Sequence, residues 1–349
     1  MIADTPTDSE REWCHDALDG TSRTFAITVD LLDEPMATQI CVSYLLCRIA
    51  DTIEDAGHIP PDVQSTLLRN YDRVLDPDDD HATEAFEHAV EPWLPDDGGE
   101  DWRVVANAPR VLRAFESLAP DARAAVLDPI RELVSGMALF VERHADTDGL
   151  RIETIEELEE YCWYAAGTVG TLITNLLARD AGPERTRRLR ETDRSFSLLL
   201  QLVNVAKDVS DDYREENNVY LPTEWLHAED VDPENVCEPS NTQSVARVIR
   251  RVTGRAQGYA DDARRYLVAA PETNGNTLAA WAVPYLLAIG TLRELDTRAE
   301  DVLREGGVKI PRAEVLAIVG QFTGDDNPPL DRLRTEIEAQ PYHLAMADS

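Results

Sequence analysis

Two stretches of sequence decide the fold and the chemistry: residues 44–55 read YLLCRIADTIED, and residues 201–212 read QLVNVAKDVSDD. Each ends in the pattern acid-x-x-acid-acid. Positions i, i+3 and i+4 of an α-helix share one face, so each stretch presents three carboxylates to one side. We therefore expect two helices with acidic faces, formed by Asp51, Glu54 and Asp55 in the first and by Asp208, Asp211 and Asp212 in the second.

The surrounding residues separate these two patterns from chance. With 67 acidic residues in 349, the spacing should arise about two or three times at random. Asp51 and Asp208 each follow eight or more almost wholly apolar residues, which predicts largely buried helices. The other occurrences lie in polar turns or in a run of glutamates, and we interpret them as solvated surface: Asp76/Asp79/Asp80, Asp97/Glu100/Asp101, Glu153/Glu156/Glu157 and Glu156/Glu159/Glu160.

Carboxylates at the ends of buried helices need a positive partner. Burying them unpaired costs several kcal/mol, and oxygen-only ligands favour Mg²⁺ or Mn²⁺ over zinc. Two facing acidic patches would hold a diphosphate through shared ions. The alternative is that each triad pairs with arginines at a helix end. Arg48 and Lys207 lie beside the acids and are either counter-charges or contacts for diphosphate oxygens.

Helical periodicity dominates the remainder of the chain, and no stretch alternates with period two. We predict one all-α domain over residues 1–349, a bundle of roughly ten helices, with residues 325–349 peripheral. The expected helices are Met36–Ala56, Pro109–Leu118, Asp121–His144, Thr154–Ala178, Glu184–Tyr213, Ser240–Ala269, Thr277–Glu305 and Pro311–Phe322.

The composition limits the class of protein. A formal charge of −34 disfavours nucleic acid as a partner, because phosphates would be repelled. The sequence holds only two lysines, Lys207 and Lys309, so arginine carries nearly all the positive charge. An acidic surface is tolerable at high salt, where screening is strong, and we interpret the charge as that of a halophilic archaeal protein.

The sequence also predicts where the protein acts. Five cysteines without a CxxC pair favour a reducing cytoplasm over a disulfide framework. The acidic N-terminus has no signal-peptide pattern. The longest apolar run, Ala279–Gly290, is shorter than the about 20 residues that span a bilayer. We expect a cytoplasmic monomer, with peripheral contact to a membrane left open.

Five motifs, in order, resemble the squalene and phytoene synthase family. The resemblance covers about residues 22–226, and the spelling DTIED is closer to squalene synthases than to phytoene synthases. The motifs are Ser22–Ala26 (SRTFA), Tyr44–Asp55, Tyr161–Gly170 (YCWYAAGTVG), Gln201–Asp212 and Val219–Pro222 (VYLP).

The resemblance implies a helical bundle around a central cavity and a role for each matching residue. Metal ions and diphosphates would be held by Asp51, Asp55, Asp208 and Asp212, with Glu54 and Asp211 on the same faces. Phosphate oxygens would be bound by Ser22, Arg23, Arg48 and Lys207. The cavity that receives the substrate would be lined by Phe25, Tyr44, Tyr164, Gln201 and Asn204, with Tyr164 steering a deprotonation. Gly167 and Gly170 would allow close helix packing.

The implied reaction is the head-to-head condensation of two farnesyl diphosphates to squalene through presqualene diphosphate, with Mg²⁺ and NADPH. Two alternatives stay open: a phytoene synthase that joins two geranylgeranyl diphosphates without reductant, and a non-catalytic relative that serves in assembly. Lys207 stands where the family usually has arginine. The segment Arg214–Asn218 (REENN) also departs from the family, because it has no arginine just before the Tyr-Leu-Pro segment that begins at Tyr220. The spellings GTVG and YLP resemble phytoene synthases, and no dinucleotide fingerprint is present.

Overall fold

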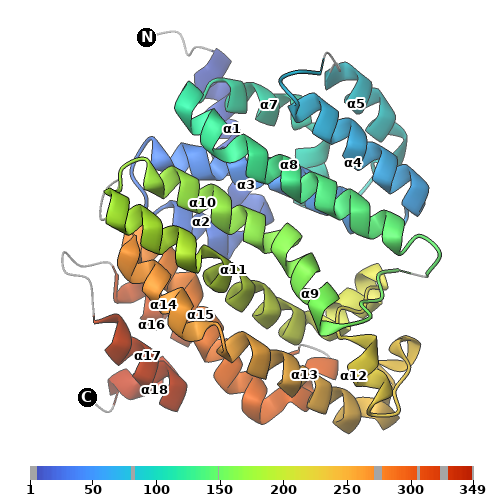
Figure 1. Ribbon diagram of the computed structural model, residues 1–349, viewed down its shortest axis with the longest axis vertical. Coiled ribbons are helices and arrows are strands. Elements are labelled where there is room, and N and C mark those ends of the chain that lie inside the picture. Colours follow the sequence, from blue (N-terminus) through green and yellow to red (C-terminus); the bar gives the residue numbers. More distant parts are fainter. Residues whose placement is uncertain are drawn as a thin grey trace.

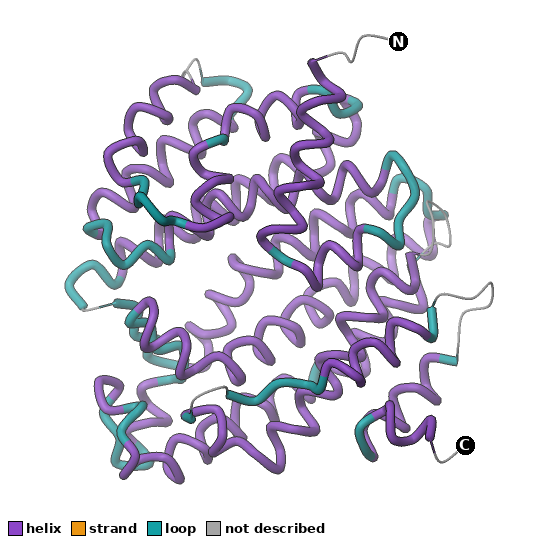
Figure 2. Tube along the Cα trace, turned by 180° about the vertical axis from the view of Figure 1, so that it is seen from behind, coloured by secondary structure: helices purple, strands orange, loops and turns teal. Residues whose placement is uncertain are grey.

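The computed structural model describes residues 6–79, 83–147, 149–270, 277–304, 307–322 and 329–347. Throughout these ranges the regular structure is helical, and an isolated bridge between Arg151 and Val219 is the one β-type pairing within them. Figure 2 shows the chain as helices joined by short loops. The prediction of an all-α fold is confirmed.

The helices are more numerous and shorter than the sequence pattern predicts. In the N-terminal half they are α1 (Pro6–Thr21), α2 (Arg23–Val29), α3 (Met36–Glu54), α4 (Pro61–Leu75), α5 (Thr83–Val90), η1 (Glu91–Trp93), α6 (Gly99–Ala106), α7 (Ala108–Glu116), α8 (Pro120–Arg143), α9 (Ile155–Cys162), η2 (Trp163–Gly167) and α10 (Thr168–Ala178). The remainder are α11 (Pro183–Asp211), η3 (Asp212–Glu216), α12 (Thr223–His227), η4 (Pro233–Asn235), η5 (Pro239–Asn241), α13 (Thr242–Gln257), α14 (Ala260–Ala269), α15 (Thr277–Arg298), η6 (Ala299–Leu303), α16 (Arg312–Gly320), α17 (Leu330–Ala339) and α18 (Tyr342–Ala347).

Helix α3 lies at the centre of the N-terminal half. Sixteen of its residues are buried, among them Leu45, Leu46 and Ile49 with no exposed surface. It packs against α1, α4, α6, α7 and α8, so that it is covered on nearly every side. A helix that is apolar all round is stable only inside a core. The apolar run that precedes Asp51 therefore fixes this helix, and its acidic end, in the interior.

Helix α11 has the same place in the C-terminal half. It packs against α10, α13, α14 and α15, and α10 in turn packs against α8. Figure 1 shows α8, α10 and α11 crossing the middle of the molecule, between the N-terminal helices and the C-terminal ones. Helices α3, α8, α10, α11 and α15 thus surround the interior where the site lies.

Three predicted helices differ from the observed ones. The helix expected over Thr154–Ala178 contains the π-helical turn η2, which separates α9 from α10. The helix expected over Glu184–Tyr213 ends in a second π-turn, η3, which continues to Glu216. The helix expected over Ser240–Ala269 breaks at Gly258 and Tyr259 into α13 and α14. A π-turn contains one more residue than an α-helical turn, and the pattern of hydrophobic residues in the sequence does not show where such a residue is inserted. π-Turns of this kind are frequent at functional sites.

The C-terminal residues are packed more firmly than the prediction of a peripheral tail implies. Helix α17 packs against α15, and it buries Leu333 and Ile337. Arg293 of α15 donates to both carboxylate oxygens of the fully buried Glu314 at 2.9 Å, and also to the carbonyls of Ile337 and Gln340. The backbone N–H of Tyr342 donates to Glu314 as well, at 2.9 Å. One ion pair therefore joins α15, α16, α17 and α18.

Within the described residues one helical segment, Thr277–Leu303, is long and apolar enough to cross a membrane by length and composition. It is longer than the apolar run counted in the sequence, because it continues through α15 into η6. However, 72% of its most apolar window is buried inside the fold. Its hydrophobicity is therefore explained by packing in the core.

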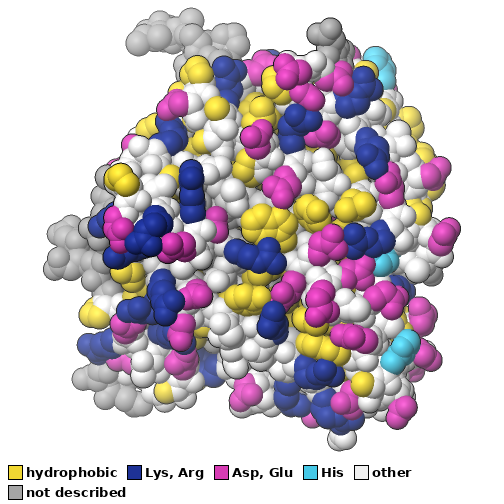
Figure 3. All heavy atoms as spheres, viewed as in Figure 1, with side chains coloured by type: hydrophobic (Ala, Val, Ile, Leu, Met, Phe, Trp, Pro, Cys, Tyr) yellow, Lys and Arg dark blue, Asp and Glu magenta, His cyan; other side chains and the backbone are white. Residues whose placement is uncertain are grey.

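The surface carries many arginine–carboxylate pairs. Acidic and basic side chains are mixed over the face shown in Figure 3. Most acids of the decoy patterns belong to such pairs: Asp76 with Arg131 at 2.9 Å, Asp79 with Arg73 at 2.9 Å, and Glu157 with Arg143 at 3.1 Å. Asp80 lies outside the described residues. Asp76, Asp79 and Glu157 are therefore held in ion pairs away from the two acidic motifs.

The pair of Arg293 with Glu314 predicts a large effect on stability. We expect Glu314→Ala to lower the free energy of unfolding by about 3 kcal/mol, because the largely buried Arg293 would keep only Glu294 as a carboxylate partner and the Tyr342 N–H would lose its acceptor. The control is Glu336→Ala, which removes an exposed pair with Arg332 and should cost at most about 1 kcal/mol. Urea titration at one fixed KCl concentration measures both, and equal losses would contradict the role of the buried pair.

Candidate active site

The first acidic motif lies at the C-terminal end of α3. Glu54 is 4% exposed, while the side chain of Asp51 is about one-third exposed and accepts a hydrogen bond from Arg48 at 2.5 Å. Arg48 also donates twice to the hydroxyl of Tyr44, at 3.2 and 3.0 Å. Burial raises the pKa of Asp51, against the opposing effect of Arg48. Burial, with Asp51 and Glu216 nearby, raises the pKa of Glu54 and of Asp55 well above the ordinary range.

The second acidic motif lies where α11 passes into η3. The ammonium group of Lys207 is in direct contact with the carboxylate of Asp208. Asp211, the last residue of α11, is exposed, whereas Asp212 begins the π-turn and is partly buried. Burial, then the charges of Asp208 and Glu216, raises the pKa of Asp212 to about 8. Asp208 and Asp212 therefore face the interior, and Asp211 lies on the solvent side.

The two motifs converge, and Glu216 lies between them. Burial raises the pKa of Glu216 to about 7, and the charges that add to this effect include Asp51 from α3 and Asp208 from α11. Asp55 and Glu54 at the end of α3 are influenced by Glu216 in return. We call these residues the acidic cluster: Asp51, Glu54, Asp55, Asp208, Asp212 and Glu216. Glu54 and Asp55 from the end of α3 and Glu216 from η3 also line one cavity, so carboxylates from the two halves of the chain lie close to one another.

An apolar cavity of about 410 Å³ adjoins the acidic cluster. This volume is within the ~300–1,000 Å³ typical of small-molecule sites. Asp51 and Arg48 line it at the polar side, and Asn204, which is exposed, lies with Gln201 along α11. The rest of the wall is mainly apolar or aromatic and includes Leu133, Met137, Val169, Ile173, Phe196, Leu200 and Trp281.

Several predicted cavity residues are brought together here. Phe25 and Tyr44 line the cavity with their rings stacked 4.6 Å apart, and Gln201 and Asn204 line it from α11. Gly170 allows α10 to approach α11 closely, because a Cβ there would meet Ser197 Oγ at 1.9 Å. Gly167 is different: its Cβ would meet the Trp163 ring of its own turn at 2.3 Å. Gly170 therefore permits close packing between two helices, whereas Gly167 makes room for a side chain of its own turn.

Other predicted site residues lie elsewhere. The ring of Tyr164 packs over Gly136 and near Phe140 of α8, and the cavity wall at this turn is formed by Ala165 and Ala166 instead. The π-turn explains this displacement, since it rotates the side chains that follow Trp163. Ser22 is the N-cap of α2, where its hydroxyl accepts from the Phe25 N–H at 3.3 Å. The side chain of Arg23 lies outside the described residues.

The sequence analysis missed two acids of this region. Asp101 was assigned to the solvated surface, but its carboxylate lies 3.4 Å from Arg48, and one of its oxygens is buried. Asp101 lies in the first turn of α6, and α6 packs against α3. The turn-rich sequence before Asp101 suggested a solvated loop, and this interpretation was wrong. Glu216 had a detectable signal, because Asn204, Asp208, Asp212 and Glu216 follow one another at intervals of four residues.

The opposite side of the acidic cluster borders a second, polar cavity of about 250 Å³, lined by Glu54, Asp55 and Glu216 among others. Glu54 Oε1 is buried there without a hydrogen-bond partner. In the described part of the chain, no three carboxylate, imidazole or thiol groups lie close enough together to hold a metal ion by themselves. An ion at this cluster would therefore need further ligands from water or from a bound anion.

The chain is similar in sequence to known proteins. The sequence model of the squalene/phytoene synthase family matches residues 18–314. The match therefore extends well beyond residue 226, where the resemblance found in the sequence ends. Squalene synthase of Schizosaccharomyces pombe is 26% identical over 311 residues, which cover 88% of this chain and 64% of that protein. For squalene synthase of Eremothecium gossypii the identity is 28% over 295 residues, with 83% and 63% covered. The chain thus spans less than two-thirds of the length of these relatives.

Solved structures share the fold. The chain of TcSQS in complex with the ligand BPH1237 superposes with a TM-score of 0.74 at 20% identity, covering 98% of this chain and 99% of that one. A dehydrosqualene synthase in complex with ligand gives a TM-score of 0.60 at 18% identity, with 96% and 100% covered. With the helical fold, the ordered motifs and a family match over residues 18–314, the chain belongs to the squalene/phytoene synthase family.

Proposed function

We propose that this protein joins two molecules of farnesyl diphosphate head to head, through presqualene diphosphate, to give squalene. The observation that supports this most is the convergence of two acidic segments on one side of an apolar cavity. A prenyl diphosphate has the matching shape: a charged head that needs cations and a long apolar tail that needs a dry pocket. The squalene synthase relatives of similar sequence support the same choice.

A divalent cation, Mg²⁺ or Mn²⁺, fits the acidic cluster. The donors are all oxygen, and the buried Glu54 oxygen lacks a partner. Mg²⁺ usually takes one or two carboxylates and completes its shell with water and phosphate oxygens, which agrees with a cluster that forms no closed cage. Asp51, Asp55, Asp208 and Asp212 would hold the ions, with Glu54, Asp211 and Glu216 near them. When bound, the ions would stabilise charge on the departing diphosphate.

The side chains of this protein account for binding and for protection of the reactive substrate. Tyr44 and Asp51 orient the guanidinium of Arg48, which can then bind a diphosphate in bidentate fashion. Lys207 would give a point charge at the second motif. The stacked rings of Phe25 and Tyr44 offer π-faces that stabilise an allylic cation. The apolar wall excludes water, which would otherwise trap the cation.

NADPH, when bound, would supply the hydride for the reductive step. The sequence contains no dinucleotide fingerprint, and we assign no residue of this chain to the reduction. Tyr164 stays our candidate for steering proton loss from the first intermediate, although it packs over Gly136 and would need to turn toward the cavity. We further propose a cytoplasmic monomer that contacts a membrane peripherally, where an apolar product would be delivered.

Phytoene synthase activity is the second candidate, because the spellings GTVG at residues 167–170 and YLP at residues 220–222 resemble that branch. A non-catalytic role in assembly is disfavoured by the two intact acidic motifs, since such proteins would have no need to keep six carboxylates crowded together.

A product assay distinguishes these functions. We expect the purified protein with Mg²⁺ to convert farnesyl diphosphate to presqualene diphosphate without NADPH and to squalene with it, as identified by gas chromatography and mass spectrometry. Conversion of geranylgeranyl diphosphate to phytoene, with no product from farnesyl diphosphate, would instead establish the second candidate. No turnover of either diphosphate would favour the non-catalytic role.

Mutation of the acidic cluster tests the role of the two motifs. Asp51→Asn and Asp208→Asn should each lower kcat by about 10²–10³, the order seen when a group that stabilises developing charge is removed. The helical circular dichroism should remain unchanged. Asp79→Asn, which alters an exposed pair with Arg73, is the matched control and should keep activity within twofold. Full activity in either cluster variant would reject the assignment.

The cluster also predicts how pH affects the metal-free protein. The pKa of Asp212 is raised to about 8 and that of Glu216 to about 7. A carboxyl group with a raised pKa favours the folded state while protonated, so stability is lost as pH rises from about 4 toward 8. We expect a lower Tm at pH 8 than at pH 5.5 in EDTA and constant KCl.

Added Mg²⁺ should raise the Tm more at pH 8 than at pH 5.5, because protons compete with the ion for the same carboxylates. The variant Asp212→Asn should weaken both the pH effect and the Mg²⁺ effect. A Tm that responds to Mg²⁺ equally at both pH values, in wild type and variant alike, would contradict metal binding at the cluster.

A further inference from the structure

Asn218 connects three groups at the exit from η3. It is 6% exposed. Its carbonyl oxygen accepts from the N–H of Leu150 at 2.8 Å, and its amide nitrogen donates to Glu216 Oε2 and to the Tyr220 hydroxyl, each at 3.3 Å. Three of the four hydrogen-bonding capacities of this buried side chain are therefore used, and one of them holds a carboxylate of the acidic cluster.

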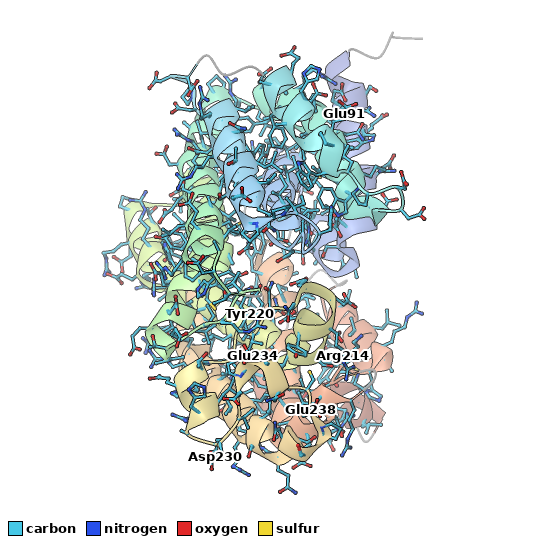
Figure 4. All side chains as sticks on the ribbon, turned by 90° about the vertical axis from the view of Figure 1, so that its right-hand side faces the viewer. Glu91, Arg214, Tyr220, Asp230, Glu234 and Glu238 are labelled. Atoms are coloured by element: carbon cyan, nitrogen blue, oxygen red, sulfur yellow. The ribbon has the colours of Figure 1, made fainter. Side chains whose placement is uncertain are left out.

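The contacts continue from Asn218 to the other acidic motif. The hydroxyls of Tyr220 and Tyr161 lie 3.1 Å apart, and the Tyr161 hydroxyl lies 3.4 Å from Glu54 Oε2. Both tyrosines are buried, and their rings lie 4.8 Å apart. The Tyr161 hydroxyl lies within donating distance of both the Tyr220 hydroxyl and Glu54 Oε2, so the contacts that start at Asn218 reach Glu54 through the two hydroxyls. Figure 4 shows Tyr220 at the level where the N-terminal and C-terminal helices meet.

The backbone at Asn218 is fixed by the connection between α8 and α9. The Val219 N–H donates to the Leu150 carbonyl at 2.9 Å, and the Ile152 N–H donates to the Val219 carbonyl at 3.2 Å. The buried guanidinium of Arg151 donates to the carbonyl of Asn217 at 2.5 Å and to its side-chain oxygen at 3.1 Å. Asn217 has a φ of 58°, which asparagine tolerates better than most residues. The turn therefore has one defined conformation.

We propose that Asn218 is a positioning residue, which holds Glu216 and, through the Tyr220–Tyr161 hydroxyls, Glu54 at a fixed separation across the acidic cluster. The proposal rests on the proposed function, because the separation matters only if cations bind between the two segments. Repulsion between carboxylates of the two halves would otherwise move η3 away from α3. With Asn218 in place the cluster is preorganised, and less of the cation's binding free energy is spent on closing it.

The test is the Mg²⁺ dependence of presqualene diphosphate formation. Asn218→Ala should raise the Mg²⁺ concentration for half-maximal rate by about tenfold or more, the order typical of groups that orient metal ligands. The kcat at saturating Mg²⁺ should fall much less, since the ligands themselves remain. Asn218→Asp should have a larger effect, because it adds a charge beside Glu216 and removes both donors.

Asn175→Ala is the matched control. Asn175 is partly buried, and its side-chain amide joins two helices, because it donates to the Ala125 carbonyl at 2.9 Å. It lies far along the chain from the acidic motifs and has no contact with the acidic cluster. Its loss should lower the Tm and leave the Mg²⁺ half-saturation unchanged. A purely structural role for Asn218 would give the same result as Asn175.

Tyr161→Phe and Tyr220→Phe keep the buried rings and remove single hydroxyls, so they serve if Asn218→Ala does not fold. Each should raise the Mg²⁺ half-saturation in the same direction. If Asn218, the two tyrosine hydroxyls and Glu54 act as one hydrogen-bonded chain, the double variant Asn218→Ala/Tyr161→Phe should raise the Mg²⁺ half-saturation by less than the product of the two single increases. A full product would show that Asn218 and Tyr161 act independently, and this would overturn the proposed chain.

The outcomes separate this inference from the proposed function. If Asn218→Ala leaves the Mg²⁺ half-saturation unchanged while Asp51→Asn abolishes turnover, the positioning role is wrong and the function stands. If the wild-type protein shows no Mg²⁺-dependent turnover of a prenyl diphosphate, the proposed function fails, and the positioning role fails with it.

Discussion

The structure depends on carboxylates from two buried helices being held close together. At an effective dielectric constant near 20, two like charges about 4 Å apart repel by about 4 kcal/mol, and repulsion of this kind acts, more weakly at larger separations, among the carboxylates of the acidic cluster. Arg48 and Lys207 offset part of this at Asp51 and Asp208. The remaining charge is tolerated through raised pKa values, as at Asp212 and Glu216. A carboxyl group that stays protonated in this way carries no charge to repel its neighbours.

The central features could be predicted because they follow from local periodicity. The apolar residues before Asp51 and Asp208 have no place outside a core, and the i, i+3, i+4 spacing places the acids on one face. These two facts suffice to predict α3 and α11 as buried helices with acids on one face. Neither fact depends on distant contacts, which explains why sequence alone was informative here.

The predictions from the sequence were wrong where the backbone departs from the α-helical period, or where a side chain contacts a residue that is distant in sequence. The π-turns η2 and η3 each insert a residue into a turn, so the predicted helix over residues 154–178 is divided and the end of α11 differs from its predicted place. Asp101 looked solvated because its neighbours in the sequence are polar, yet it lies against Arg48 from another helix. Hydrophobic patterns contain no information about either effect. The ends of helices and their long-range partners have to come from the structure.

Acidic residues have two different environments in this protein. Outside the acidic cluster, acids such as Asp76 and Glu157 are partly buried and bonded to arginines. In the acidic cluster, the sequence lacks the arginine expected just before Tyr220, and Asn217 and Asn218 stand there instead. Arg151 donates to Asn217, so a guanidinium still supports this turn, but from the connection between α8 and α9. The guanidinium of Arg151 therefore fixes the backbone behind the cluster, and Glu216 and Glu54 accept hydrogen bonds from Asn218 and Tyr161 instead of from an arginine. This distribution of arginines distinguishes the site from the surface in a chain where acidic residues are everywhere.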